Sequence, residues 1–284
     1  MVEFFQTHFA FLGPAYSVAY GLVNGLGLRF IAVAEVLAIY FVIEMAIPKG
    51  RRNSLAATWR GALFNATSLT FNTFLFTAIY AVLAREDLVP LFHVDISWLT
   101  KSEHLPLRVL GWIGAAFGIA MVGDVFYYWL QRAQHGVPVL WRFHRVHHSI
   151  EEMSAVSSYH HIAEETMQYF AVVIPIALFL KIDAEAVPWL VTTLVGTHNY
   201  FIHSSMNVNI GPLRYIFADN HYHRIHHSLE PQHFNKNFGT ATPWWDIVFG
   251  TAYFPKRGEW PKTGLSDVPE PRTVKDYITL PFRK

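Results

Sequence analysis

The chain has 284 residues, of which 52% are hydrophobic and 15% are charged, whereas an average soluble domain has roughly 25% charged residues. The net charge of +1 and the lack of a basic tract with interleaved aromatic residues argue against a nucleic-acid partner. The chain contains no cysteine, which excludes iron–sulfur, blue-copper and thiolate–zinc sites. This composition predicts an all-α integral membrane protein.

The first segment of the chain is apolar but irregular. Gly13, Pro14 and Gly21 interrupt the apolar run over residues 9–28, and the segment lacks the basic–apolar–small order of a cleaved signal peptide. We therefore predict an N-terminal interfacial segment over residues 1–29.

Apolar runs of about 20 residues, the length needed to cross a bilayer, follow along the chain. The last apolar region is too long for one span and is interrupted by Pro175, by residues 181–183 and by Pro188, so we expect it to form a helical hairpin. We predict about four transmembrane helices in a multi-pass protein. The segments concerned are residues 30–48, 62–83, 107–130 and the hairpin over 167–201.

Basic residues set the expected orientation. Lys49, Arg51, Arg52 and Arg60 lie between the first two spans without an acidic residue, which favours the cytoplasmic side. Counting from there places residues 85–108 outside, and residues 131–165 and the chain after His203 in the cytoplasm. The proline-rich segment 255–284 is then expected to be an extended cytoplasmic tail.

Twelve of the sixteen histidines lie between residues 135 and 227, and six of them form two copies of one spacing. The copies are His144-x-x-His147-His148 and His223-x-x-His226-His227. Positions i, i+3 and i+4 share a helix face, so we expect each triplet to present three imidazoles to one point. Imidazole suits iron, copper, nickel and zinc. Because the expected orientation places both triplets on the cytoplasmic side, the two copies predict two metals at one membrane surface.

Further residues around the triplets occur in a recognisable order. Asp124 and an aromatic run precede His135 and the first triplet, and other elements lie before and after the second triplet. These elements are Tyr127-Tyr128-Trp129, Tyr159-His160-His161-Ile-Ala-Glu164, Phe201-Ile-His203, Asn235-Lys-Asn237-Phe-Gly239 and Trp244-Trp-Asp246-Ile-Val-Phe-Gly250-Thr251. In this order, over residues 107 to 252, the chain resembles the fatty acid hydroxylase/sterol desaturase superfamily.

The resemblance implies that residues 30–254 form a membrane fatty acid hydroxylase-like domain, with a cytoplasmic helical cap that holds a dinuclear metal site. It implies that Glu164 orients a ligand imidazole. The metal ligands that it implies are His135, His144, His147, His148, His161, His203, His223, His226 and His227.

The resemblance also implies the chemistry. Two iron ions would use O2 to oxidise C–H bonds of a fatty acyl, sterol or related lipid that enters from the bilayer; hydroxylation is the main expectation and desaturation an alternative. The sequence has no Gly-x-Gly-x-x-Gly fingerprint after a strand and no cysteine cluster. We therefore expect electrons from a separate ferredoxin or flavoprotein reductase. Arg142, Arg145 and Arg224 could dock it, although arginines this close to metal ligands more often support the ligands themselves.

One position departs from the family pattern. Gln131 stands where the family has the first histidine of a His-x-x-x-His pair ending at His135. An amide oxygen is a weaker ligand than imidazole, so that metal is bound less tightly, reached through a water, or ligated by a neighbour such as His160 or Asp124. Alternatively the protein is a non-catalytic or zinc-bound membrane homologue. Because both triplets are present, we predict a working site in which Gln131 and Glu164 assist the reaction.

A haem-binding electron carrier is a further alternative, but it needs histidines facing each other within the bilayer, whereas the triplets lie at span ends. The remaining polar residues have weaker expectations. We expect His198 beside the substrate path, His221 either behind the ligands of the second triplet or facing solvent, and Asp246 to hold an imidazole or an arginine in place. The other histidines are expected at the surface: His8, His93, His104 and His233.

Overall fold

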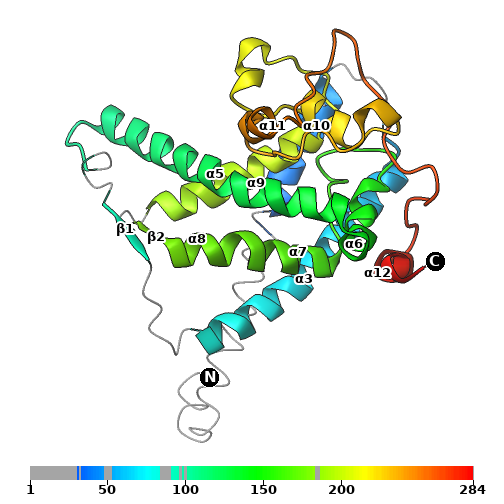
Figure 1. The fold of residues 1–284 in the computed structure, drawn as a ribbon, viewed down its shortest axis with the longest axis horizontal. Helices are drawn as coiled ribbons and strands as arrows, with labels where there is room; N and C mark the ends of the chain where they lie inside the picture. Colours follow the sequence, from blue (N-terminus) through cyan, green and yellow to red (C-terminus); the bar gives the residue numbers. More distant parts are fainter. Residues whose placement is uncertain are drawn as a thin grey trace, which may run out of the picture.

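The computed structural model describes residues 31, 33–47, 53–83, 91–95, 98, 101–182 and 186–283. The predicted interfacial segment over residues 1–29 lies outside them. In the described part, the chain is helical apart from two three-residue strands. Long helices cross the molecule, and the short helices after residue 203 lie along its upper and right-hand sides (Figure 1).

The helices coincide with the apolar runs of the sequence. Residues 33–46 are helical, and they are followed by α3 (Leu55–Leu83) and α5 (Leu105–Gly136). The hairpin predicted over residues 167–201 begins at the end of α7 (Ile162–Gln168) and continues through the π-helical turn η2 (Tyr169–Val173), α8 (Ile174–Phe179) and the returning α9 (Ala186–His203). Among the described helices, α5 is the one that is long and apolar enough to span a membrane.

Two short strands join distant parts of the chain. β1 (Phe92–Val94) pairs in parallel with β2 (Leu180–Ile182). The all-α prediction missed this pair because three residues are too few to show the alternation of a strand. β1 and β2 lie at the end of α5 that is remote from α6 (Figure 1), and they connect the segment before α5 with the predicted hairpin.

The histidine-bearing helices lie at the other end of α5. The chain turns there into α6 (Pro138–His148), which begins with a proline, a residue that suits the first helical position. α10 (Asn220–His226) begins at Asp219, whose carboxylate accepts a hydrogen bond from the Tyr222 N–H at 2.8 Å. The elements that complete this end are η3 (Gly211–Tyr215), η4 (Pro231–His233), α11 (Trp244–Phe249), α12 (Val274–Thr279) and η5 (Leu280–Phe282).

The C-terminal segment differs from the expected extended tail. α12 and η5 are helical, and Tyr277 and Leu280 are buried in a core with Phe64, Val146 and Tyr159. The prolines of this segment indicated an open conformation, but its apolar side chains find partners on α3 and α6. The chain end is therefore part of the core beside the histidine helices.

Candidate metal centre

Eight of the nine histidines predicted as metal ligands form two groups. Within each group, one ligand atom per residue lies within 4.8 Å of the others. Cluster A consists of His135, His144, His148 and His226; cluster B consists of His147, His203, His223 and His227. All are buried except the half-buried His135, and either cluster could hold a metal ion.

Each histidine triplet is divided between the two clusters, so the expectation that one triplet points at one metal is wrong. In both triplets the first and third histidines share a cluster, and the middle one belongs to the other cluster. Residues i and i+4 are about 40° apart around a helix, whereas i+3 and i+4 are about 100° apart. Each helix therefore faces two sites. His135 at the end of α5 completes cluster A, and His203 at the end of α9 completes cluster B.

The nitrogen spacing is that of ligands to a common ion. Neighbouring Nε2 atoms within a cluster are 2.9–3.2 Å apart. Two nitrogens that each lie about 2.0–2.1 Å from one ion, at bond angles of about 90–110°, are about 2.9–3.4 Å apart. The pairs concerned are His135–His148, His144–His148, His148–His226, His147–His203, His203–His223 and His223–His227.

The opposite ring nitrogens point outward. The Nδ1 atoms of three ligands lie 2.7–2.9 Å from backbone carbonyl oxygens, to which an Nδ1–H donates. This tautomer leaves the Nε2 lone pair free toward the centre of the cluster. The pairs are His147 with Tyr159, His203 with Asn199, and His226 with Lys236. The backbone thus orients ligands of both clusters.

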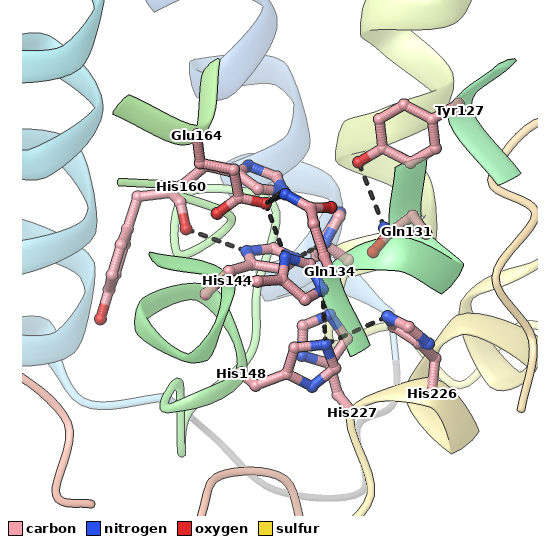
Figure 2. A network of polar contacts seen from close by, with 12 residues as sticks. Tyr127, Gln131, Gln134, His144, His148, His160, Glu164, His226 and His227 are labelled. Carbon is pink, nitrogen blue, oxygen red and sulfur yellow. Dashed lines mark hydrogen bonds and ion pairs between the residues drawn. The ribbon is translucent and has the colours of Figure 1, made fainter. Parts of the chain in front are cut away.

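Glu164 orients a fourth imidazole. It is buried in the first turn of α7, and its Oε1 lies 2.6 Å from Nδ1 of His144 (Figure 2). The same oxygen accepts a hydrogen bond from Nε2 of Gln134 at 3.1 Å. Burial raises the pKa of Glu164 to about 8. Gln134 was missed by the sequence analysis; its signal was a second glutamine three residues after Gln131, next to His135.

Burial keeps the imidazoles of the short helices neutral, which is the form that binds metal. It lowers the pKa of His226 to about 4, and a backbone hydrogen bond only partly opposes this. Burial, and to a smaller extent repulsion from neighbouring histidines, lowers the pKa of the other five triplet histidines well below the usual range: His144, His147, His148, His223 and His227.

Gln131 lies beside cluster A without belonging to it. Its side chain is fully buried one turn before His135, and its Nε2 donates to the Tyr127 hydroxyl at 3.3 Å (Figure 2). Its Oε1 is buried and has no hydrogen-bond partner among the described residues. Each cluster has four imidazoles without this amide.

Neither His161 nor His160 belongs to a cluster, and both make other contacts. Nδ1 of His161 accepts from the Ala163 N–H at 3.1 Å, which caps α7, and its Nε2 donates to the Ile278 carbonyl at 3.2 Å. Both ring nitrogens are thus engaged with the backbone. His160 stacks on His147 with ring centroids 3.7 Å apart and an angle of 14°.

Two buried carboxylates hold one loop beside the clusters. Asp124 on α5 accepts from three consecutive backbone N–H groups of residues 240–242 at 3.0–3.2 Å. Asp246 accepts from the N–H groups of residues 238 and 239 at 2.7–2.8 Å, so it holds backbone rather than an imidazole or an arginine. His198 also contacts this loop, through the Thr240 carbonyl at 3.1 Å.

The histidines expected at the surface differ in their positions. His104 is exposed, and His8 lies outside the described residues. The expectation for His233 is wrong because its side chain is 1% exposed and contacts Ser228 Oγ at 2.8 Å and Glu259 Oε1 at 3.1 Å. Partners that come from distant residues could not be read from its sequence neighbourhood.

Known proteins are similar to this chain in sequence. The family model described as Fatty acid hydroxylase matches residues 114–251. Alkylglycerol monooxygenase of Homo sapiens is 29% identical over 140 residues, which cover 49% of this chain and 30% of the relative. Ornithine lipid hydroxylase OlsE of Rhizobium tropici is 30% identical over 166 residues, 56% of this chain and 45% of the relative. Methylsterol monooxygenase 1 of Gallus gallus is 25% identical over 197 residues, which cover 68% of this chain and 62% of the relative.

The chain thus spans only part of the length of these relatives, and no solved structure matches it significantly. The matched segment begins within α5 and ends just after α11, and it contains all eight histidines of clusters A and B. Over residues 114–251, close to half of its length, the chain is similar to the fatty acid hydroxylase family.

Proposed function

We propose that this protein is an O2-dependent oxygenase that holds one iron ion in each cluster and hydroxylates a C–H bond of a lipid. The observation that carries the proposal is the pair of adjoining four-imidazole clusters. The ring of His148 in cluster A stacks on that of His227 in cluster B, with centroids 4.5 Å apart. Neutral imidazoles suit iron, and two neighbouring sites suit a reaction that needs more than one electron.

The lipid substrate is supported by the relatives and by the surface. The relatives are named for alkylglycerol, methylsterol and ornithine lipid. α5 exposes large apolar side chains, and an extended apolar surface is typical of contact with a membrane or a partner. These side chains are Leu105, Leu107, Val109, Leu110, Ile113, Val122 and Trp129.

We also propose the topology of the sequence analysis, with about four transmembrane helices and both clusters and the C-terminus in the cytoplasm. His135 and His203 support it because they end the two long helices α5 and α9, which pack against each other. The clusters would then lie where the helix ends meet the membrane surface, within reach of a lipid from the bilayer and a reductase from the cytoplasm.

The chain's own residues position and protect the reaction. Bound ferrous ions would supply electrons that activate dioxygen for the oxidation of a C–H bond, and an external ferredoxin or flavoprotein reductase would restore them. The backbone carbonyls and Glu164 fix the ligand rings, and burial of the rings excludes water. The free Oε1 of Gln131 would accept a hydrogen bond from a water or a polar substrate group beside cluster A.

The test begins with iron per chain after iron-supplemented expression and purification in lipid. The loaded protein is then given a chemical reductant, a lipid extract and 18O2, and the products are analysed by mass spectrometry. We expect two iron ions per chain and one 18O atom in a hydroxylated lipid. A desaturase would give an unsaturated product without 18O. Zinc in place of iron without dioxygen consumption, or a haem absorption spectrum, would contradict the proposal.

A further inference from the structure

The two triplets carry an arginine at the same place. Both read His-Arg-x-His-His, with Arg145 in the first copy and Arg224 in the second. Nη2 of Arg145 donates to the carbonyls of Leu280 and Arg283, each at 2.8 Å. Nε of Arg224 donates to the Pro261 carbonyl at 2.8 Å. Both arginines are therefore bound to the backbone of the C-terminal segment rather than free to dock a reductase.

A second set of contacts joins the same parts of the chain. Thr263 forms an isolated antiparallel bridge with Ser228, the residue that follows the second triplet and α10. Its Oγ1 donates to the carbonyl of Glu151 at 3.0 Å, shortly after the end of α6. The Thr263 side chain is buried. One residue thus contacts the chain just beyond both histidine helices.

A third set of contacts leads to a predicted metal ligand, His147. The buried Glu270 pairs with Arg60 of α3 at 3.1 Å and accepts a hydrogen bond from the Tyr159 hydroxyl at 3.2 Å. The carbonyl of Tyr159 is the group that orients Nδ1 of His147 in cluster B. Residues 259–283, which we call the C-terminal clamp, therefore contact α6, α10 and the segment between α6 and α7.

The division of the triplets makes these contacts important for both clusters. α6 and α10 each supply ligands to cluster A and to cluster B, so a shift of one helix against the other displaces ligands in both. α6 packs on α5 and η5, whereas α10 packs on α9. The C-terminal clamp is bound to both histidine helices through the arginine of each triplet.

We propose that the C-terminal clamp fixes the position of α6 relative to α10, with Arg145 and Arg224 as positioning residues for both metals. The clamp lies outside the segment that matches the family. This inference rests on the two-metal function proposed above. Loss of groups that orient metal ligands typically lowers metal affinity about 10–100-fold. Because each helix serves two clusters, loosening either arginine weakens both sites together.

The test uses the iron-loaded chain of 284 residues and the rate of iron loss to a chelator. We expect Arg145→Ala and Arg224→Ala to release iron about tenfold faster or more than the parent, with both ions leaving in one phase. Arg224→Lys keeps a cationic donor and should restore part of the retention. Arg142→Ala is the matched control because Arg142 is exposed on the same helix as Arg145, and it should release iron at the parent's rate.

Thermal unfolding of the metal-free proteins separates positioning from general stability. Faster release from a variant that unfolds at the parent's temperature supports the clamp, and Thr263→Val tests it with a smaller change if an arginine variant does not fold. If folded arginine variants release iron at the parent's rate, the clamp proposal is wrong but the proposed function is not. The same holds if a variant loses one ion and keeps the other. A parent chain that binds fewer than two iron ions overturns the proposed function itself.

Discussion

At the scale of single residues, adjacent histidines serve different clusters. His147 and His148 are neighbours in the chain, yet the first belongs to cluster B and the second to cluster A. Successive residues of a helix are about 100° apart, so one helix edge can face two sites. A His-His dipeptide at the end of such a helix links two metals through the shortest possible length of chain.

This arrangement predicts a specific pattern of metal loss. His147→Ala and His227→Ala come from different triplets but the same cluster, so each variant, and the double variant, should lose one iron and keep the other. His147→Ala combined with His148→Ala should lose both because it removes one ligand from each cluster. Iron per chain measures each case. Loss of both ions from the His147→Ala/His227→Ala double variant would instead favour one triplet per metal.

Gln131 provides a second residue-scale prediction. Gln131→His should keep two iron ions but lower turnover or change the product, because the imidazole replaces a buried amide oxygen that is free to bind a water or a substrate group. Iron content and product yield are measured beside the parent. Higher turnover with the same product would show that the amide only fills a ligand position, and absence of iron from both proteins would contradict the oxygenase proposal.

At the scale of elements, the loop before α11 depends on a glycine. A Cβ on Gly239 would lie 2.3 Å from the Thr242 carbonyl oxygen and 3.0 Å from Oδ2 of Asp246. Gly239 and Thr242 belong to the loop that Asp124 and Asp246 hold through backbone hydrogen bonds. The loop therefore has no room for a side chain at this position.

Gly239→Ala should lower the stability of the folded protein by about 1–3 kcal/mol or more, because backbone atoms must move to admit the methyl group. Thermal unfolding in detergent is the measurement. Gly118→Ala is the control, since no atom lies within 4 Å of the added Cβ and alanine is favoured over glycine in a helix by about 1 kcal/mol. Equal unfolding temperatures for both variants would contradict the crowded loop.

At the scale of the whole molecule, α5 connects two chemically different ends. Its N-terminal end lies near the paired strands β1 and β2, and its C-terminal end carries His135 and leads into α6 (Figure 1). If α5 crosses the membrane, these ends face opposite sides. The proposed orientation assigns the histidine end to the cytoplasm.

The absence of native cysteine allows a direct labelling test of that orientation. Glu103 precedes α5 and Arg142 lies on α6, and both are exposed. In intact cells, an impermeant thiol reagent should label Glu103→Cys but should label Arg142→Cys only after the membrane is opened. A reporter fused after Lys284 should be active in the cytoplasm. The reverse labelling pattern would invert the topology.

Much of this organisation follows from local sequence. The apolar runs coincide with the long helices, and the spacing of the triplets together with His135 and His203 identified all eight histidines that cluster. Such features depend on residues within a few turns of each other, where helix geometry fixes the outcome. The resemblance to the family, rather than local spacing, identified Glu164 as the carboxylate beside a ligand.

The sequence by itself determined the ligand type, the two triplets and their place at helix ends. Only the tertiary structure decided how each triplet is shared, that His161 caps α7, that His233 is buried, and that the C-terminal segment binds both triplet arginines. The physical reason is that spacing along one helix fixes the angle between its side chains, but not the partners that those side chains meet. Those partners come from α5, α9 and the chain end, and packing alone brings them together.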